Sequence, residues 1–165
     1  MSLIKRPSGG RASAVRKVML LGQSNVGKTS LANSLAFGRF EMNYKRTIGV
    51  ELYTADIVFD GSPHRLILWD TDGRIQDEMV ASSYCKGAAG ACIIGDLTRP
   101  ETIEAARETL EIFEELYPGR PTRLIGNKLD LAPGSVLENG TCVSVHDGTG
   151  VAKVLEEIAR ECWAD

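Results

Sequence analysis

A glycine-rich stretch with one lysine points most directly to chemistry. Residues 22–29 read GQSNVGKT, which fits the pattern G-x-x-x-x-G-K-[ST]. The glycines let the backbone wrap around an anion, and backbone N–H groups with the start of a following helix supply positive potential. Lys28 would then reach terminal phosphates, and the Thr29 hydroxyl would bind Mg²⁺. A strand-to-helix turn with an incidental lysine is the alternative, and it accounts less well for both the pattern and its position.

A second short motif contains the residues for a metal and a terminal phosphate. Residues 70–73 read DTDG and follow an apolar segment that ends in Trp69. The Asp70 carboxylate is suited to hold a water molecule of a Mg²⁺ shell. Gly73 gives the chain a place to pivot, so that its N–H can approach a terminal phosphate. A D-x-x-G turn is weak evidence alone, and its position after this segment strengthens it.

The third motif, NKLD at residues 127–130, decides between nucleotide bases. The Asp130 carboxylate only accepts hydrogen bonds, which suits the adjacent imide N–H and exocyclic amine of guanine. Adenine lacks this pair of donors and would leave the carboxylate unpaired, at a cost of about 1 to 3 kcal/mol or more. By itself the tetrapeptide is as compatible with an Asn-Lys turn at a helix end.

The elements that position these motifs alternate along the chain. Apolar segments at 18–21, 91–95, 122–126 and 141–145 predict strands, and 50–59 with 64–69 predicts a hairpin around the turn at 60–62. Helices are predicted at about 28–36, from Pro100 to before Pro118, and at the C-terminal end. This order predicts an α/β fold with a mostly parallel sheet, one antiparallel strand and helices on both faces. Ligands of such sheets bind at the carboxyl ends of the strands, where all three motifs fall.

Size and composition limit the remaining possibilities. The 165 residues, 43 % hydrophobic and 25 % charged, fit one globular domain, which we place at residues 15–165 after a flexible basic arm at 1–14. A basic arm is compatible with acidic lipid or nucleic acid, although a solvated tail is the better interpretation, and we expect no nucleic acid partner. Four cysteines without CxxC spacing predict buried thiols in a reducing compartment, and no apolar run approaches a membrane span. We therefore expect a cytoplasmic protein.

In the order and spacing of these motifs the chain resembles the Ras superfamily of small GTPases, most closely its Rab branch. The stretches YKRTIGVEL at 44–52, LWDT at 68–71 and SSYCKGA at 82–88 carry the resemblance. It implies a three-layer phosphate-loop NTPase fold, with a six-stranded sheet, that binds GTP or GDP with Mg²⁺. It also implies that residues 40–50 and 71–80 change shape on hydrolysis and are read by effector, exchange and activating proteins.

The resemblance assigns roles to individual residues. Thr47 would bind Mg²⁺ and sense the third phosphate beside Thr29 and Asp70, and Phe40 would pack against the base. The reacting groups would be held by Lys28, Thr47, Gly73 and Arg74. The residues expected to contact the nucleotide are Ser24, Asn25, Val26, Gly27, Lys28, Thr29, Ser30, Phe40, Tyr44, Thr47, Gly73, Asn127, Lys128, Asp130, Ser144, Val145 and His146.

Arg74 is the departure from the family pattern with the clearest chemical consequence. It stands where the family usually has the glutamine that orients the attacking water, and a guanidinium has no acceptor for that water's hydrogen bond. We therefore expect slow intrinsic hydrolysis. The competing hypothesis is that Arg74 stabilises developing charge as a built-in arginine finger.

Other departures concern partners. Asp72 replaces a usually small residue, and Asp77 with Glu78 makes the second switch more acidic. The 17 positions that separate Asn127 from Ser144 leave no room for the family's extra helix, so we expect a turn there and a sheet edge open to a partner or to self-association. Cys162 lies on the apolar stripe of the last helix, which favours burial over prenylation, and no stable membrane anchor is evident.

The sequence is compatible with three alternative functions. The first is a GTP-hydrolysing switch. The second is a binding module or scaffold that holds GTP and hydrolyses little, which Arg74 keeps open. The third, a phosphate-loop ATPase or kinase, is opposed by Asp130.

Overall fold

The computed structural model describes residues 15–37, 49–74, 78, 80 and 83–164. Its strands are β1 (Val15–Leu21), β2 (Val50–Phe59), β3 (Ser62–Thr71), β4 (Gly90–Asp96), β5 (Thr122–Asn127) and β6 (Thr141–Cys142). Its helices are α1 (Lys28–Phe37), α3 (Pro100–Leu116) and α4 (Val151–Cys162), with a 3-10 turn, η1 (Ser83–Cys85).

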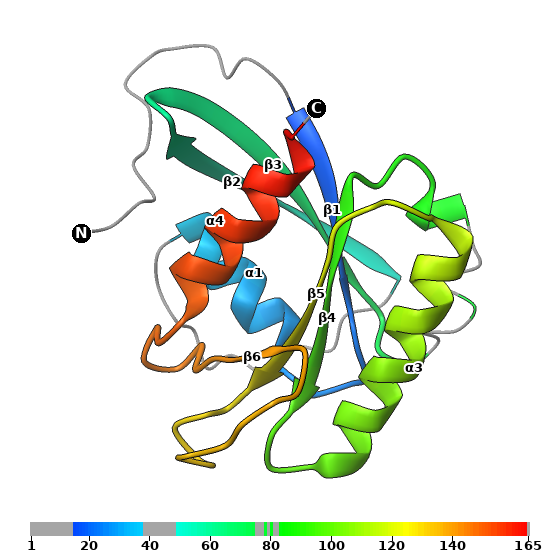
Figure 1. The fold of residues 1–165 in the computed structure, drawn as a ribbon, viewed down its shortest axis with the longest axis vertical. Coiled ribbons are helices and arrows are strands. Elements are labelled where there is room, and N and C mark those ends of the chain that lie inside the picture. The colour runs from blue at the N-terminus through cyan, green and yellow to red at the C-terminus, as the bar shows by residue number, and fades with distance from the viewer. Residues whose placement is uncertain (1–14, 38–48, 75–77, 79, 81–82, 165) are drawn as a thin grey trace.

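The six strands form one sheet in the order β2-β3-β1-β4-β5-β6 (Figure 1). Every neighbouring pair is parallel except β2 and β3, which form the predicted antiparallel hairpin. The predicted fold class, a phosphate-loop NTPase fold with one antiparallel strand, is confirmed. Because β1 lies in the middle of the sheet, the loop that follows it opens near the centre of one sheet edge.

Alternating side chains of the central strands pack against helices on both faces. Val18 and Leu20 of β1 face α1 and α4, whereas Met19 and Leu21 face α3. Figure 1 shows these layers, with α1 and α4 on one side of the sheet and α3 on the other. Phe113 of α3 is fully buried, and burying such a side chain contributes about 1.5 to 3 kcal/mol.

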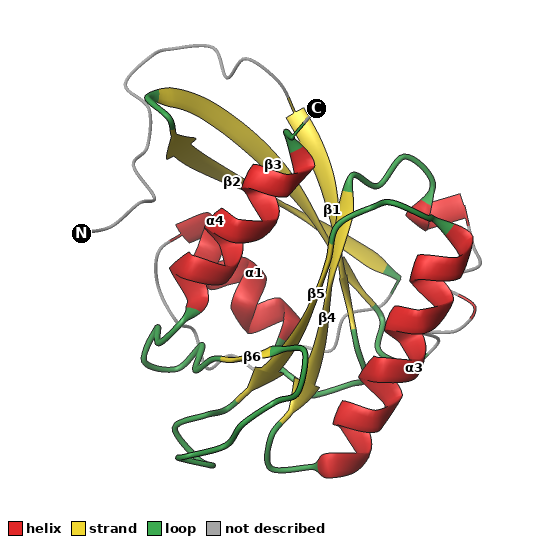
Figure 2. Ribbon diagram, viewed as in Figure 1, coloured by secondary structure: helices red, strands yellow, loops and turns green. Residues whose placement is uncertain are grey.

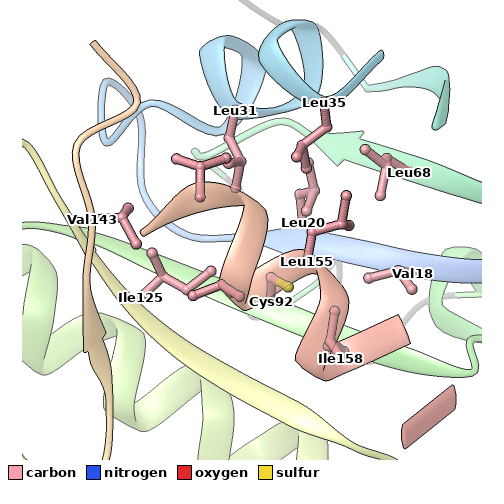
Figure 3. Close-up of a pocket in the computed structure, with 12 residues that line it drawn as sticks. Val18, Leu20, Leu31, Leu35, Leu68, Cys92, Ile125, Val143, Leu155 and Ile158 are labelled. Carbon is pink, nitrogen blue, oxygen red and sulfur yellow. The ribbon is translucent and has the colours of Figure 1, made fainter. Parts of the chain in front are cut away.

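The layer between α1, α4 and the sheet is apolar and nearly filled. It contains a cavity of about 10 Å³. Figure 3 shows side chains that line this cavity, among them Leu20, Leu31, Cys92, Leu155 and Ile158. A cavity of this size has room for at most one water molecule and offers that molecule no polar partners. It is a packing defect of the core, and it lies apart from the nucleotide motifs.

Two sequence-based expectations need correction. The last strand is Thr141–Cys142 alone, because after Val143 donates to the Gly126 carbonyl (2.8 Å) the Ser144 N–H turns to the Thr149 carbonyl (3.0 Å). The cysteines are not all buried: Cys85 and Cys92 are, but Cys142 and Cys162 are only partly so. Burial raises the pKa of the Cys162 thiol to about 11.

The expected absence of a helix between β5 and β6 is confirmed. All of residues 128–140 are described, and they form turns and loop without a helix (Figure 2). No helix among the described residues has the length and apolarity that crossing a membrane requires.

The two ends of the described chain lie close together. Arg16 at the start of β1 donates to the Cys162 carbonyl at the end of α4 (3.3 Å), and its guanidinium lies 5.6 Å from the Trp163 ring. Figure 1 places both ends at the edge of the sheet opposite the loop that leaves β1.

Candidate nucleotide-binding site

The loop of residues 22–27 has the backbone that a phosphate cradle requires. Gly22 (φ +140°) and Gly27 (φ +105°) have positive φ, which glycine adopts without strain. Asn25 (φ +68°) lies in the left-handed region, which asparagine enters more readily than most residues. A Cβ on Gly22 would lie 2.2 Å from the Ile94 carbonyl oxygen, so the loop packs directly against β4. It leads into α1, whose first turn contains no acidic residue and includes the half-buried Ser30. The strand-loop-helix context predicted for the motif is therefore present, and the N-terminus of α1 supplies positive potential at the loop.

Lys28 is held over this loop. Its side chain is only 6 % exposed, and its Nζ donates to the Gln23 carbonyl (2.7 Å). Burial lowers its pKa to about 8, an effect that Asp70 and Asp72 oppose and Arg99 adds to. A buried cation at a helix N-terminus is suited to stabilise a terminal phosphate by charge-assisted hydrogen bonds.

Thr29 and Asp70 form the candidate metal position. The Thr29 hydroxyl donates to Asp70 Oδ2 (2.5 Å), and Asp70 is fully buried at the end of β3. A hydroxyl and a carboxylate fit Mg²⁺, which prefers oxygen ligands and completes its shell with water and phosphate oxygens. The third predicted ligand, Thr47, lies outside the described residues, as do Phe40 and Tyr44.

Asn127 connects the base loop to the phosphate loop. Its side-chain amide donates to the Val26 carbonyl (2.9 Å) and accepts from the Val145 N–H (3.1 Å), and it is 4 % exposed. Lys128, with φ +69°, donates to the Asn25 carbonyl (3.0 Å). Two of the predicted base-site residues are therefore fastened to the backbone of residues 25 and 26.

Asp130 stands at the open side of the same loop. It is exposed, and the Ser144 hydroxyl donates to its Oδ1 (2.8 Å). Ser144 is buried, so it fixes the carboxylate without competing for a ligand that arrives from solvent. His146, two residues after Ser144, is exposed as well. The structure thus brings the predicted residues of the phosphate loop and of the base loop together in one site.

Two charged residues that contact these loops, Asp96 and Arg99, were not predicted from the sequence. Asp96 at the end of β4 is 1 % exposed and bonds to Lys128 Nζ (2.7 Å) and to Arg99 Nε (3.0 Å). Burial alone would raise its pKa, but bonds from Lys128, Thr98 and Arg99 outweigh it and lower the pKa to about 2. Arg99 also donates to the Ser24 carbonyl (3.1 Å). The signal was available, because Asp96 ends an apolar strand at the ligand edge.

The residues after β3 are arranged as sequence reasoning did not foresee. The Arg74 guanidinium donates to both carboxylate oxygens of Asp72 (3.0 and 2.6 Å), which is 3 % exposed. Gly73, between them, packs on the phosphate loop, since a Cβ there would lie 2.3 Å from the Ser24 nitrogen. Asp72 and Arg74, which both depart from the family pattern, thus form an ion pair with each other.

The strand order, the phosphate loop with its buried lysine and the base loop fastened to it define a phosphate-loop nucleotide-binding protein. Comparison with known proteins specifies this class further, because the model of the Ras family matches residues 17–164. The chain belongs to the Ras family.

The similar curated proteins are Rab-named. The chain is 35 % identical over 147 residues to the Ras-related protein RABA5e of Arabidopsis thaliana, covering 87 % of this chain and 64 % of that protein. It is 33 % identical over 161 residues to mouse Ras-related protein Rab-36, covering 96 % and 58 %. To Ras-related protein Rab11D of Lotus japonicus it is 38 % identical over 116 residues, covering 70 % and 53 %. The chain thus spans less than two thirds of the length of each of these relatives.

Proposed function

We propose that this chain binds GTP and GDP with Mg²⁺ and works as a molecular switch that hydrolyses GTP slowly. The observation that carries the proposal is the attachment of the base loop to the phosphate loop through Asn127 and Lys128. This attachment sets the distance between the anion cradle and the Asp130 carboxylate, and that carboxylate matches the paired donors of guanine. A guanine nucleotide satisfies both ends of the site, whereas an adenine nucleotide leaves Asp130 unpaired.

The arrangement around Arg74 supports slow hydrolysis. The guanidinium contributes donors only, and both of its bonds within the described residues go to Asp72. It therefore offers no acceptor to an attacking water, and it is engaged elsewhere rather than extended as an arginine finger. When bound, Mg²⁺ would supply charge neutralisation at the terminal phosphates, held through Thr29 and Asp70.

The test of base selection is a competition experiment. A fluorescent GDP analogue is bound to the purified chain with Mg²⁺, and unlabelled GDP, GTP and ATP are titrated against it. We expect GDP and GTP to compete at least 100-fold better than ATP, and Asp130→Ala to lose most of this preference. Glu138→Ala, which removes an exposed acidic residue from the same loop, is the matched control and should change nothing. Equal competition by ATP would support the ATPase or kinase alternative and refute the proposal.

The test of hydrolysis is a single-turnover assay with preloaded GTP. The double variant Asp72→Ala/Arg74→Gln restores both family residues at once, and we expect it to hydrolyse GTP about tenfold or more faster than the parent. A parent faster than the double variant would favour the arginine-finger hypothesis. A parent with no measurable rate, and GTP present in the purified protein, would favour the alternative function of a GTP-bound binding module or scaffold.

We further propose that partners of the switch are effector, exchange and activating proteins that contact the regions around residues 40–50 and 71–80, and that the protein acts in the cytoplasm.

We also propose that the protein self-associates through the loop between β5 and β6. In this loop, next to the two-residue edge strand β6, Leu131 is 68 % and Val136 is 91 % exposed. Sedimentation at high concentration tests this, and a strictly monomeric protein would contradict it.

A further inference from the structure

One buried carboxylate organises the turn that follows β3. Asp72 accepts from the Arg74 Nε (3.0 Å), from its Nη2 (2.6 Å) and from the Arg74 backbone N–H (3.0 Å). The Asp72 N–H in turn donates to the Gly49 carbonyl (2.8 Å). The Asp72 side chain is 4 % exposed and that of Arg74 is 46 % exposed, so the negative charge lies inside and the neutralising charge at the surface.

The turn that contains this carboxylate packs against the phosphate loop. Gly73 touches the phosphate loop so closely that a Cβ would lie 2.3 Å from the Ser24 nitrogen and 2.5 Å from the Gln23 carbonyl carbon. Under the proposed function the terminal phosphates bind at this loop, so the charge of Asp72 lies next to the part of the site where the third phosphate distinguishes GTP from GDP.

An unpaired carboxylate at this position would repel the third phosphate more than the second. Repulsion between like charges is strong where both are removed from water. The bidentate guanidinium cancels the charge of Asp72 and fixes its direction. Neither the loss of a water-orienting glutamine nor an arginine finger accounts for a buried acid at residue 72, whereas charge cancellation requires both residues.

We propose that Asp72 and Arg74 form one unit that sets the preference of the site between GTP and GDP, with Arg74 neutralising a carboxylate that would otherwise select against the third phosphate. The inference rests on the proposed function, since it presumes that the site binds guanine nucleotides. It gives Arg74 a role in nucleotide selection that is independent of the rate of hydrolysis.

A double-mutant cycle tests the unit. The dissociation constants of GDP and of a non-hydrolysable GTP analogue are measured with Mg²⁺ for the parent, Arg74→Ala, Asp72→Ala and the double variant. Arg74→Ala should weaken binding of the GTP analogue about tenfold relative to GDP. Asp72→Ala, which leaves an unpaired guanidinium, should shift the ratio the other way. The double variant should return to within about twofold of the parent ratio.

The ion pair between Arg65 and Asp56 in the β2–β3 hairpin is the matched control. It has the same bidentate geometry (2.6 and 3.0 Å) and lies on strands away from the phosphate loop. Arg65→Ala should leave the ratio unchanged. Should Asp72→Ala fold poorly, Asp72→Asn keeps the shape of the side chain and removes its charge, and it should shift the ratio in the same direction.

Two results would overturn the inference: an unchanged ratio in Arg74→Ala, or a double variant that keeps the full deficit of Arg74→Ala. In both cases GDP binding by the parent would leave the proposed function standing. A parent that bound neither nucleotide would refute the proposed function and this inference together.

Discussion

Replacing Asn127 with alanine tests whether the base loop and the phosphate loop form one structural unit. The side chain of Asn127 satisfies the Val26 carbonyl and the Val145 N–H, at 2.9 and 3.1 Å, and both of those residues are buried. An alanine side chain can neither donate to the Val26 carbonyl nor accept from the Val145 N–H. Each backbone group that loses its partner in the interior costs about 1 to 3 kcal/mol, so we expect the free energy of unfolding to fall by about 3 kcal/mol in total. This is a large part of the about 5 to 15 kcal/mol available to a domain of this kind.

Urea unfolding of the nucleotide-free protein measures this loss, with the slope of the transition checked for constancy. The control is Thr109→Ala, because Thr109 is equally buried but donates to the Ala105 carbonyl within α3 and leaves no backbone group alone there. Its cost should stay near 1 kcal/mol. The affinity for GDP is measured as well, and it should fall for Asn127→Ala only. If the two variants lost the same stability and affinity, the reasoning about the shared backbone groups would be wrong.

Three further outcomes can be checked. Gly27→Ala places a Cβ 2.3 Å from Asn127 Nδ2 and should weaken GDP binding at least tenfold. Gly119→Ala is the control, because Gly119 has a similar φ and open space around it, and it should leave GDP binding unchanged; equal effects of the two variants on GDP binding would assign the weakening to φ alone. The pKa of Asp96 is about 2 in the folded protein, below the unfolded value of about 3.9, so its contribution of about 2 kcal/mol to the free energy of unfolding is present above pH 4 and lost towards pH 2. An Asp96→Asn variant should therefore lose less stability than the parent over that pH window in acid unfolding, and a profile parallel to that of the parent would contradict this. Ile158→Ala in the core should cost about 2 to 5 kcal/mol in thermal or urea unfolding, against less than about 0.5 kcal/mol for the exposed Val136→Ala; similar losses would show that the layer under α4 is not closely packed.

Hydrophobic periodicity and turn residues predicted most of the fold because these signals act locally. The predicted strands and helices are all present, and their bounds differ mainly at β1, which begins at Val15 rather than residue 18, and at β6. After β6, residues 143–145 stay buried although the backbone has left the ladder, and the two valines among them are apolar. Burial in that turn produces the same pattern as a strand, so periodicity alone could not end β6 at Cys142.

The site was predictable where a motif fixes the spacing, and unpredictable where contacts cross between elements. The placements of Lys28, Thr29 and Asn127 followed from motifs, but the role of Asn127 as a bridge to Val26 did not. The pair of Asp72 and Arg74 was missed because each residue was compared with the family separately. Two residues apart across a turn, they meet only when Gly73 bends the chain, and no rule of helix or strand spacing covers that geometry.

The joining of Arg16 to the end of α4 has a practical consequence for experiments on this molecule. Figure 1 shows the start of β1 beside the end of α4, and the loop of residues 22–29 leaves β1 at its other end. A fluorophore, an affinity tag or a surface tether joined at the start of β1 or the end of α4 is therefore held away from the proposed nucleotide site. The molecule can therefore be immobilised by one end while nucleotide exchange is recorded at the other.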